Sequence, residues 1–586
     1  MNRKPRSLTE GMLNSLIPAQ MFSAALLNIN AFLNSVITGA LLSAKSIAAI
    51  SFTQPITLLI SVLGGAIATG AQVMCGRYIG RGDGKGADRI FTLSALWCLV
   101  LGAIMTISCI FFAEPISALM GAEGADLTNC AQYLRGMSGS IIFMMFSTAL
   151  TTFMQLDNAP NMSMLAITAM VVTSIVFDFI NVKVFDMGIF GIGLATTVGY
   201  AAVLFVGVAY YASKKCNFKF SFSLSALKES GEMFYIGIPG AASSIALALR
   251  AFVLNNLCFR LAGTIGVSAI GVFYSMSGFV SAIGNGVGGA AGILSSVFVG
   301  ERDRTSLRKL GPMATKKAWI MHAIAYAVVW LTAKPFAILF GTSAGDMQFV
   351  VHAIRCSMTC FLVNIFGCVG FNMYKSIGNT WLVSICSILD YFVFQCVAAW
   401  LLSIPFGIDG VWFISIFSEL ATYLIMLLYC RKKLGRAPGA LNYVYIPRSI
   451  SAKPEDCYDV SMKTLEEVEE VSAQVVELCK SKGMDSRRSY FCGLCIEEQC
   501  ANIILHGMTK VSDASKCSID LRMIFEDGKV TFSLRDNCRK FDPTSWRRRE
   551  NETDPMKGVG IKMVQQLAEK VSYRRTFGLN MLLVEI

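Results

Sequence analysis

The sequence predicts a polytopic helical membrane protein that carries a separate α+β domain at its C-terminus. Apolar stretches follow one another from about residue 16 to residue 430, and each is long enough to cross a bilayer, which takes about 20 residues. From about residue 434 the chain becomes charged and has no such stretches. The 586 residues are 54% hydrophobic and 15% charged, whereas a soluble chain carries about a quarter charged residues.

The membrane part contains an internal repeat. We expect twelve spans, centred near residues 28, 58, 101, 145, 173, 200, 248, 280, 327, 362, 392 and 419. Gly80 in YIGRGDGKG corresponds to Gly300 in FVGERDRTS, and Gly121 corresponds to Gly341, in each case 220 residues further on. Because an even number of spans separates equivalent positions, the two six-span halves share one orientation, with a substrate cavity expected between them. The expected units are a bundle over 1–215, a bundle over 216–433, a linker over 434–456 and a domain over 457–586.

Basic loops predict the topology. Lys and Arg gather in alternate loops, and such loops stay in the cytoplasm. We therefore expect a multi-pass protein of the plasma membrane with both termini in the cytoplasm. The net charge of +12 is explained by these loops, so the expected partner is the lipid bilayer and not a nucleic acid. The basic residues of this set are Arg3, Lys4, Arg6, Arg77, Arg81, Lys85, Arg89, Lys214, Lys215, Lys219, Lys228, Arg302, Arg304, Arg308, Lys309, Lys316, Lys317, Arg431, Lys432, Lys433 and Arg436.

The 19 cysteines show no spacing typical of a disulfide framework. Cys492, Cys495 and Cys500 lie close to His506, but they fall within a predicted helix. We expect them to pack on its buried face rather than to bind a metal.

The C-terminal domain is predicted from local patterns. Apolar residues at three- and four-residue spacing indicate an amphipathic helix over 464–483, and a second helix is expected over 486–507. Residues 515–537 are typical of a hairpin that turns at Asp527-Gly528. A glycine turn, a helix and the start of a strand are expected over 558–575, with a last strand over 576–586. Helices and hairpins grouped in this way favour an α+β layer sandwich.

Three short motifs in this domain carry its chemistry. Glu498 and Asn502 are four residues apart and share one helical face, Asp536 follows a strand in LRDN, and Gly558 and Gly560 precede a helix. Together they resemble the N, G1 and G2 boxes of the Bergerat ATP-binding fold, which gyrase and histidine kinases share. The domain is most similar to the anti-sigma-factor serine kinases.

The resemblance implies Mg²⁺ and ATP as cofactors. Asn502 would offer its amide oxygen to the Mg²⁺ that bridges the phosphates. Glu498 would act as a general base, and Asp536 would accept the adenine amino proton. Gly558 and Gly560 would let backbone N–H groups approach the phosphates.

Two residues of the domain depart from the family pattern. Cys538 replaces a glycine, and Lys557 replaces the first glycine of the G2 box, where a lysine could contact phosphate. Residues 544–556 would form the lid. Serine/threonine-kinase-like activity therefore stays open at this stage.

The membrane part resembles the multidrug and toxic compound extrusion (MATE) family over about residues 10–433. The residues that carry the resemblance are Pro18, Pro239, SIAAISFTQPITLL, GRYIGRGDGKGADR and the stretch from LDNAPN to GLATTV. It implies two six-helix bundles around a V-shaped cavity, and export of a small molecule driven by Na⁺ or H⁺.

Ionisable residues inside spans are functional candidates, because burying a charge in a bilayer is costly. Asp178 lies in the fifth span with Asn181 one turn on, and Asp390 and Glu419 lie in spans eleven and twelve. These acids could instead pair with one another or face water at span ends. Many relatives place a coupling aspartate in the first span, where this chain has Asn34. An amide cannot titrate, so Asn34 could only coordinate Na⁺ or bind substrate.

Two functions remain at this stage. The first is a MATE-like antiporter of organic cations or other xenobiotics, with a cytosolic ATP-binding domain in a regulatory or kinase-like role. The second is a membrane-anchored signalling protein that senses a ligand and acts on a soluble regulator protein. The phosphate-cradling motif G-x-x-x-x-G-K-[ST] is absent from the sequence, which disfavours direct ATP drive.

Overall fold

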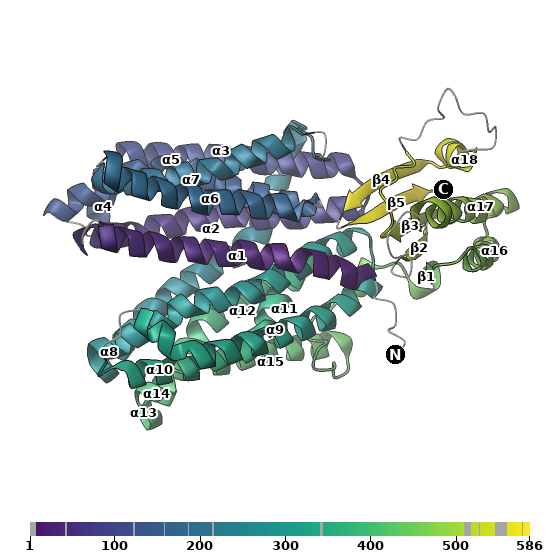
Figure 1. Cartoon of the computed structure of the whole chain (residues 1–586). Helices are drawn as coiled ribbons and strands as arrows, with labels where there is room; N and C mark the ends of the chain where they lie inside the picture. Colours follow the sequence, from purple (N-terminus) through teal and green to yellow (C-terminus); the bar gives the residue numbers. More distant parts are fainter. Residues whose placement is uncertain are drawn as a thin grey trace.

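Two helical bundles lie side by side, and a small α+β domain sits against one end of both (Figure 1). The computed structural model describes residues 8–41, 44–120, 124–157, 159–185, 187–213, 216–339, 344–508, 517–526, 528–544, 559–576 and 578–586. We call the end that carries the small domain the domain-side end. The ribbons of the two bundles converge there and diverge toward the opposite end (Figure 1).

Seven helices form the first bundle. They are α1 (Leu8–Leu41), α2 (Ala44–Gly80), α3 (Gly84–Phe111), α4 (Ala113–Leu119), α5 (Gly124–Leu156), α6 (Pro160–Ile180) and α7 (Gly188–Tyr211). A π-turn, η1 (Asn181–Phe185), follows α6 directly.

The second bundle has a similar layout with more breaks. Its helices are α8 (Ser230–Gly300), α9 (Arg304–Leu339), α10 (Met347–Ser357), α11 (Ile365–Ile377), α12 (Thr380–Ile388), α13 (Gln395–Phe406), α14 (Ile408–Val411) and α15 (Ile414–Leu434). Within α8, Gly263 adopts a φ of 64° and separates two spans. A π-turn, η4 (Leu389–Phe394), joins α12 to α13.

The described residues contain 11 helices that are long and apolar enough to cross a membrane, or up to 12 if the pair Met347–Leu362 and Ile365–Ile377, bent by 41°, counts as one span. This confirms the predicted polytopic fold. The bent pair corresponds to the span expected near residue 362.

The segment between bundle and domain lies on the second bundle. Tyr443 is fully buried. Its hydroxyl is 3.0 Å from Thr315 Oγ1, and its carbonyl oxygen accepts a bond of 2.9 Å from the Tyr374 hydroxyl. The predicted linker is therefore anchored to the second bundle.

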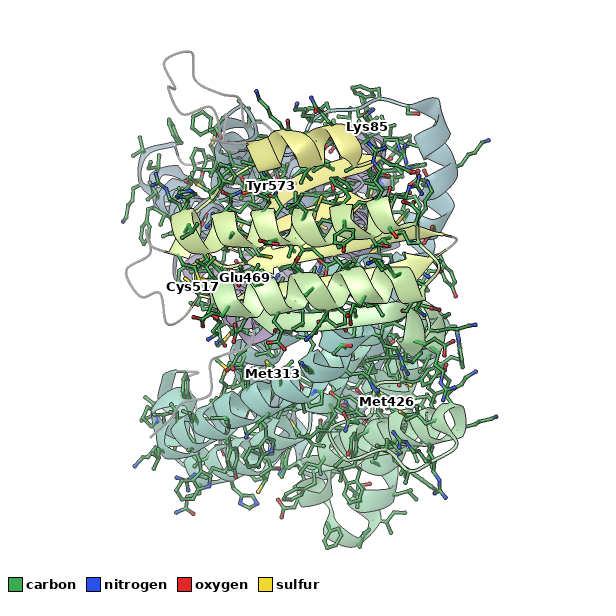
Figure 2. All side chains as sticks on the ribbon, turned by 90° about the vertical axis from the view of Figure 1, so that its right-hand side faces the viewer. Lys85, Met313, Met426, Glu469, Cys517 and Tyr573 are labelled. Carbon is green, nitrogen blue, oxygen red and sulfur yellow. The ribbon has the colours of Figure 1, made fainter. Side chains whose placement is uncertain are left out.

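The C-terminal domain is one antiparallel sheet with helices on one face. The sheet order is β1-β2-β3-β5-β4. Figures 1 and 2 show the helices lying across the face that points away from the bundles. The elements are β1 (Cys457–Met462), α16 (Leu465–Ser481), α17 (Ser486–Asn502), β2 (Ile519–Glu526), β3 (Lys529–Asp536), α18 (Val559–Leu567), β4 (Lys570–Thr576) and β5 (Leu579–Glu585).

Local signals explain these elements. Thr464 and Glu467 form a capping box that starts α16. Gly528 has a φ of 75° in the turn between β2 and β3, which confirms the predicted hairpin. Cys492, Cys495 and Cys500 are fully buried in the domain core, as the helix pattern predicted.

Candidate functional sites

Asp178 is a buried acid at the end of α6. Its side chain is 1% exposed, and its Oδ1 accepts no hydrogen bond from a described residue. Tyr133, on α5, lies within electrostatic range of this carboxyl group. Asp178 therefore keeps a free acceptor inside the first bundle, as a binding residue would.

Asn181 has a different environment. It is fully buried, its Nδ2 donates to the Gly188 carbonyl at 3.2 Å, and its Oδ1 accepts from the Met187 N–H at 3.2 Å. A Cβ on Gly191 would lie 1.9 Å from that Oδ1. The amide thus holds the turn between α6 and α7. The side chain of Asn34, on α1, lies outside the described part of the structure.

The second bundle brings Asp390 and Glu419 together. Asp390 is in the π-turn η4 and Glu419 is on α15, and their side chains are 0% and 4% exposed. Asp390 Oδ2 and Glu419 Oε2 have no hydrogen-bond partner among the described residues. A Cβ on Gly367 would lie 3.9 Å from Asp390 Oδ2 and 3.2 Å from Glu419 Oε2. Two free carboxylate oxygens therefore face one small space.

Polar groups hold the other oxygens of this acid pair. Ser418 Oγ donates to Asp390 Oδ1 at 2.6 Å, and the Asn364 amide donates to Glu419 Oε1. Arg250 lies near both acids and donates to Gln395 Oε1 at 3.0 Å. A proton or a small cation placed between the free oxygens would relieve the repulsion of two buried like charges.

Glu498 and Asn502 occupy the predicted positions on α17. Both are half-buried, and no hydrogen bond reaches either side chain from the described residues. Asn502 ends the helix, and the π-turn η7 (Ile503–Gly507) follows. A free amide and a free carboxylate one turn apart fit a Mg²⁺ ligand and a general base, because Mg²⁺ prefers oxygen ligands.

Asp536, at the end of β3, is 3% exposed. Its Oδ1 accepts from Asn580 Nδ2 at 2.8 Å and from the Cys538 N–H at 2.9 Å, while Oδ2 takes part in neither bond. Burial raises the pKa of this carboxyl group above its ordinary value. Cys538 is 2% exposed, and its Cβ would be 3.1 Å from a Cβ on Gly507, so its side chain packs into the domain core.

The glycine box is described only in part. Gly560 lies in the first turn of α18. Lys557 and Gly558 lie outside the described residues, as does most of the predicted lid. The described residues Asn502, Glu498 and Asp536 fit Mg-ATP, since the first two keep free oxygen atoms and Asp536 is a buried acceptor.

Family models match both parts of the chain. The MatE family model matches residues 19–180 and 239–401, which together exceed half of the chain. This chain belongs to the MATE family. A second model, the histidine kinase-like ATPase domain, matches residues 462–586. The MATE bundles are therefore fused to a domain of this ATPase type, as the sequence resemblance predicted.

Related proteins resemble the MATE part of the chain. Multidrug export protein MepA of Staphylococcus saprophyticus is 26% identical over 426 residues, which cover 72% of this chain and 93% of that protein. MepA of Staphylococcus aureus is 24% identical over 423 residues, with the same coverage. A solved structure titled as the outward-facing conformation of a multidrug resistance MATE family transporter matches with a TM-score of 0.68 and 21% identity, covering 74% of this chain and 99% of that one.

Two features of the structure were not predicted from the sequence: the π-turns and the arginines of the sheet that lie out of solvent. The π-turns of the described chain, η1, η4 and η7, all lie at or beside predicted site residues, which is common for π-turns. Buried arginines on the sheet, considered below, were also missed. Their signal was one arginine in each strand at a position that alternates with the apolar residues of the domain core.

Asp178→Asn tests the site in the first bundle. We expect gradient-driven efflux to fall about tenfold, equivalent to about 1.4 kcal/mol of lost interaction. The amide keeps the shape of the side chain but removes its charge. Efflux from vesicles that contain equal amounts of inserted protein measures the effect. Glu114→Gln, at a side chain that is 62% exposed, is the matched control. Equal efflux from Asp178→Asn and the control would exclude Asp178 from the site.

Proposed function

We propose that this MATE protein is a secondary exporter of organic cations or other xenobiotics, driven by entry of Na⁺ or H⁺, and that its C-terminal domain binds Mg-ATP and regulates export. The observation that carries the proposal is the buried pair Asp390 and Glu419, whose free oxygens face one space. Burying ionisable groups inside a membrane protein costs free energy, which makes these two acids functional candidates.

The substrate class is supported by the relatives and by charge. The matched MepA proteins are named multidrug export proteins. In this chain Asp178 is a buried acid with a free acceptor in the first bundle. A negative side chain in an apolar bundle favours a cationic substrate or a cation that exchanges with it.

The proposed topology places both termini and the C-terminal domain in the cytoplasm of the cell, on the plasma membrane. The loops and helix ends at the domain-side end carry Arg77, Arg81, Arg302 and Arg304. Basic loops of this kind stay in the cytoplasm. ATP is then available to the C-terminal domain.

Within that domain, Asn502 would hold Mg²⁺ through its amide oxygen and Asp536 would accept a proton of the adenine amino group. Bound Mg-ATP would supply a transferable phosphoryl group. Glu498, one turn before Asn502, is placed to take a proton from a hydroxyl group.

A second candidate function follows from the same residue. Because no described residue bonds to the Glu498 carboxylate, the domain could phosphorylate a soluble regulator protein, with the bundles acting as a sensor. The helical face of the domain points away from the bundles (Figure 2), so a partner protein could reach it.

Transport without ATP tests the proposal. In sealed vesicles that hold the purified full chain and no nucleotide, we expect an imposed Na⁺ or H⁺ gradient to drive movement of a labelled organic cation. The reason is that ion entry, and not phosphoryl transfer, supplies the energy. Initial uptake rates with each gradient alone identify the ion. Strict dependence on ATP would overturn secondary transport, and transport under neither gradient would favour the sensor.

A further inference from the structure

Two buried arginines and one that is mostly buried lie on the sheet face that meets the bundles. Residues of a strand alternate between its two faces. In β2, β3 and β4 most of the apolar residues face the domain helices, and one arginine per strand faces the bundles. Their side chains are 4%, 7% and 15% exposed, although arginine is seldom buried without a partner. These residues are Arg522, Arg535 and Arg574.

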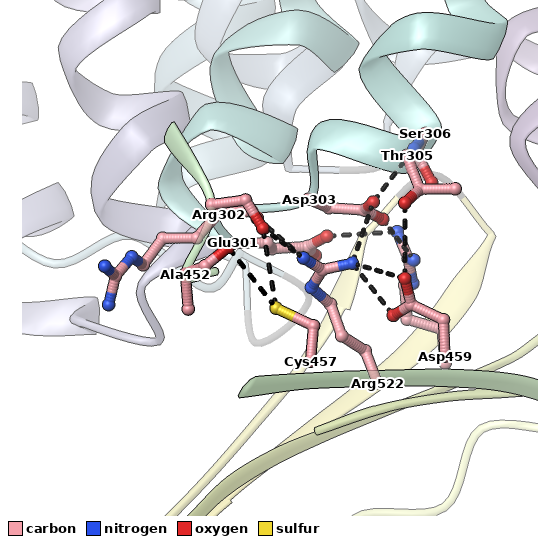
Figure 3. A network of polar contacts seen from close by, with 11 residues as sticks. Glu301, Arg302, Asp303, Thr305, Ser306, Ala452, Cys457, Asp459 and Arg522 are labelled. Atoms are coloured by element: carbon pink, nitrogen blue, oxygen red, sulfur yellow. Dashed lines mark hydrogen bonds and ion pairs between the residues drawn. The ribbon is translucent and has the colours of Figure 1, made fainter. Parts of the chain in front are cut away.

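Two of them bind the loop between α8 and α9 of the second bundle, and Figure 3 shows Arg522 beside this loop. Arg535 donates from Nη1 to Glu301 Oε2 at 3.0 Å and from Nη2 to Asp303 Oδ2 at 2.6 Å. Arg522 donates from Nη1 to Asp303 Oδ1 at 3.3 Å and from Nη2 to the Arg302 carbonyl at 2.8 Å. The domain is thus held by charge-assisted bonds that are removed from water.

The acids of this loop are buried as deeply as the arginines. The side chains of Glu301 and Asp303 are 3% and 2% exposed. Burial raises the pKa of Glu301 to about 7. Burial acts in the same direction on Asp303, but Arg535 and Arg522 outweigh it and lower the pKa of Asp303 to about 2. Asp303 therefore stays ionised at any physiological pH.

The third arginine contacts the first bundle. Arg574 Nη2 lies 3.7 Å from Asp157 Oδ1, and its guanidinium lies 4.6 Å from the centre of the Phe218 ring. Asp157 is fully buried and also accepts from the Tyr210 hydroxyl at 2.8 Å and from Asn217 Nδ2 at 2.8 Å. One sheet therefore contacts both bundles.

Equivalent loops of the two bundles contact the sheet differently. Gly82, with a φ of 67°, lies so close to the sheet that a Cβ would be 2.5 Å from Ser572 Oγ. At the equivalent position of the second bundle, Arg302 adopts a φ of 58°, which side chains rarely do, and pairs with Glu526. Backbone strain at a residue other than glycine is typical of functional positions.

The bundles themselves touch under the sheet. A Cβ on Gly80 would lie 2.1 Å from the Val297 carbonyl oxygen, and a Cβ on Gly300 would lie 2.1 Å from the Arg77 carbonyl oxygen. Backbone meets backbone at the ends of α2 and α8. The domain-side end can open only if these helix ends separate.

We propose that the C-terminal domain is a clamp that holds the two bundles together at the domain-side end, which opens only after the sheet releases one of them. This inference rests on the proposed function, since secondary transport by alternating access requires one bundle to rock against the other. The clamp is close to the candidate nucleotide site. Arg535 and Asp536 are neighbours on β3 that face opposite sides, and they pair with Met581 and Asn580 of β5. A shift of β3 at Asp536, in the candidate nucleotide site, would therefore also move Arg535, which binds the second bundle.

Opening can be measured at Ser296. It is fully buried on α8, and a Cβ on Gly76 of the first bundle would lie 1.9 Å from its Oγ. Ser296→Cys in the full-length protein is treated with N-ethylmaleimide in detergent. Peptide mapping separates labelling at this position from labelling of the native cysteines. The labelling rate reports separation of α2 from α8.

Asp303→Asn should raise this rate about tenfold, since breaking a buried ion pair is strongly destabilising. Asparagine still accepts the helix-capping bond from the Ser306 N–H. Asp83→Asn is the matched control. Asp83 is the repeat equivalent of Asp303 and caps α3 through the Gly86 N–H, with no bond to a described residue of the domain. The control should label at the parent rate.

Arg522→Gln tests the clamp from the domain side. It should raise the rate by a similar factor, and the two effects should be less than additive, because Asp303→Asn and Arg522→Gln both remove the Arg522–Asp303 ion pair. Equal rates for Asp303→Asn and Asp83→Asn, or fully additive effects, would overturn the clamp. Labelling needs no gradient, substrate or nucleotide. A protein that labels as expected but fails to transport would therefore contradict the proposed export function and leave the clamp supported.

Discussion

Replacing Glu419 by glutamine, or Asp390 by asparagine, is expected to abolish gradient-driven transport. Both substitutions keep the size and the accepting oxygen that Asn364 or Ser418 binds, but remove a charge from a buried site. A charge interaction of about 3 kcal/mol in such a site corresponds to a loss of at least about a hundredfold. Initial rates in vesicles under each ion gradient measure the effect.

Asp409→Asn is the control for this experiment. Asp409 lies on α14 in the same bundle, and its side chain is 58% exposed. We expect wild-type rates from this variant. Transport by Glu419→Gln at the rate of Asp409→Asn, with equal insertion, would show that the ion is bound elsewhere, with Asp178 in the first bundle as the next candidate.

Loss of nucleotide binding is the second large effect. Asp536→Ala and Asn502→Ala should each weaken Mg-ATP binding by the full-length protein at least about a hundredfold, since each is expected to hold a different end of the nucleotide. Glu498→Ala should leave binding intact and lower any phosphoryl transfer by about 10²–10⁴-fold, the usual contribution of a general base. Calorimetry and phosphate transfer assays measure the two effects.

Glu497→Ala serves as the neighbouring control. Glu497 is exposed on the same helix, and its Oε2 accepts a bond of 3.3 Å from Ser472 of α16. Glu497→Ala should change neither Mg-ATP binding nor phosphoryl transfer. If the wild-type chain binds no Mg-ATP, the departures at Cys538 and Lys557 have removed the site, and the domain acts through the clamp or a partner protein.

Local patterns predicted most of the fold. Span length, the repeat around Gly80 and Gly300 and the Asp527-Gly528 turn depend on neighbouring residues, so they could be recognised in the sequence. β1 was missed, because CYDVSM is short and polar and gains its structure by pairing with β2. Such an edge strand depends on distant residues.

The sequence predicted which residues are candidates for the sites, but not which of them lie together in the fold. The sequence left open whether Asp390 and Glu419 pair with one another or face water, and their free oxygens face one space only because η4 and α15 pack together. Asn181 was a candidate for ion coupling, whereas the structure engages its amide in the turn before α7. Arg522 and Arg535 were not named as candidates, since their partners in the second bundle lie more than two hundred residues away.

One measurement tests the central claim that an ion-driven exporter is controlled by its C-terminal domain. Initial export rates are compared in sealed vesicles under the same ion gradient, with and without Mg-ATP on the domain side, for the wild type and for Asp536→Ala. We predict transport without nucleotide in both, and a rate that changes with Mg-ATP in the wild type only. No transport until ATP is added, or the same response to Mg-ATP in Asp536→Ala, would contradict the account.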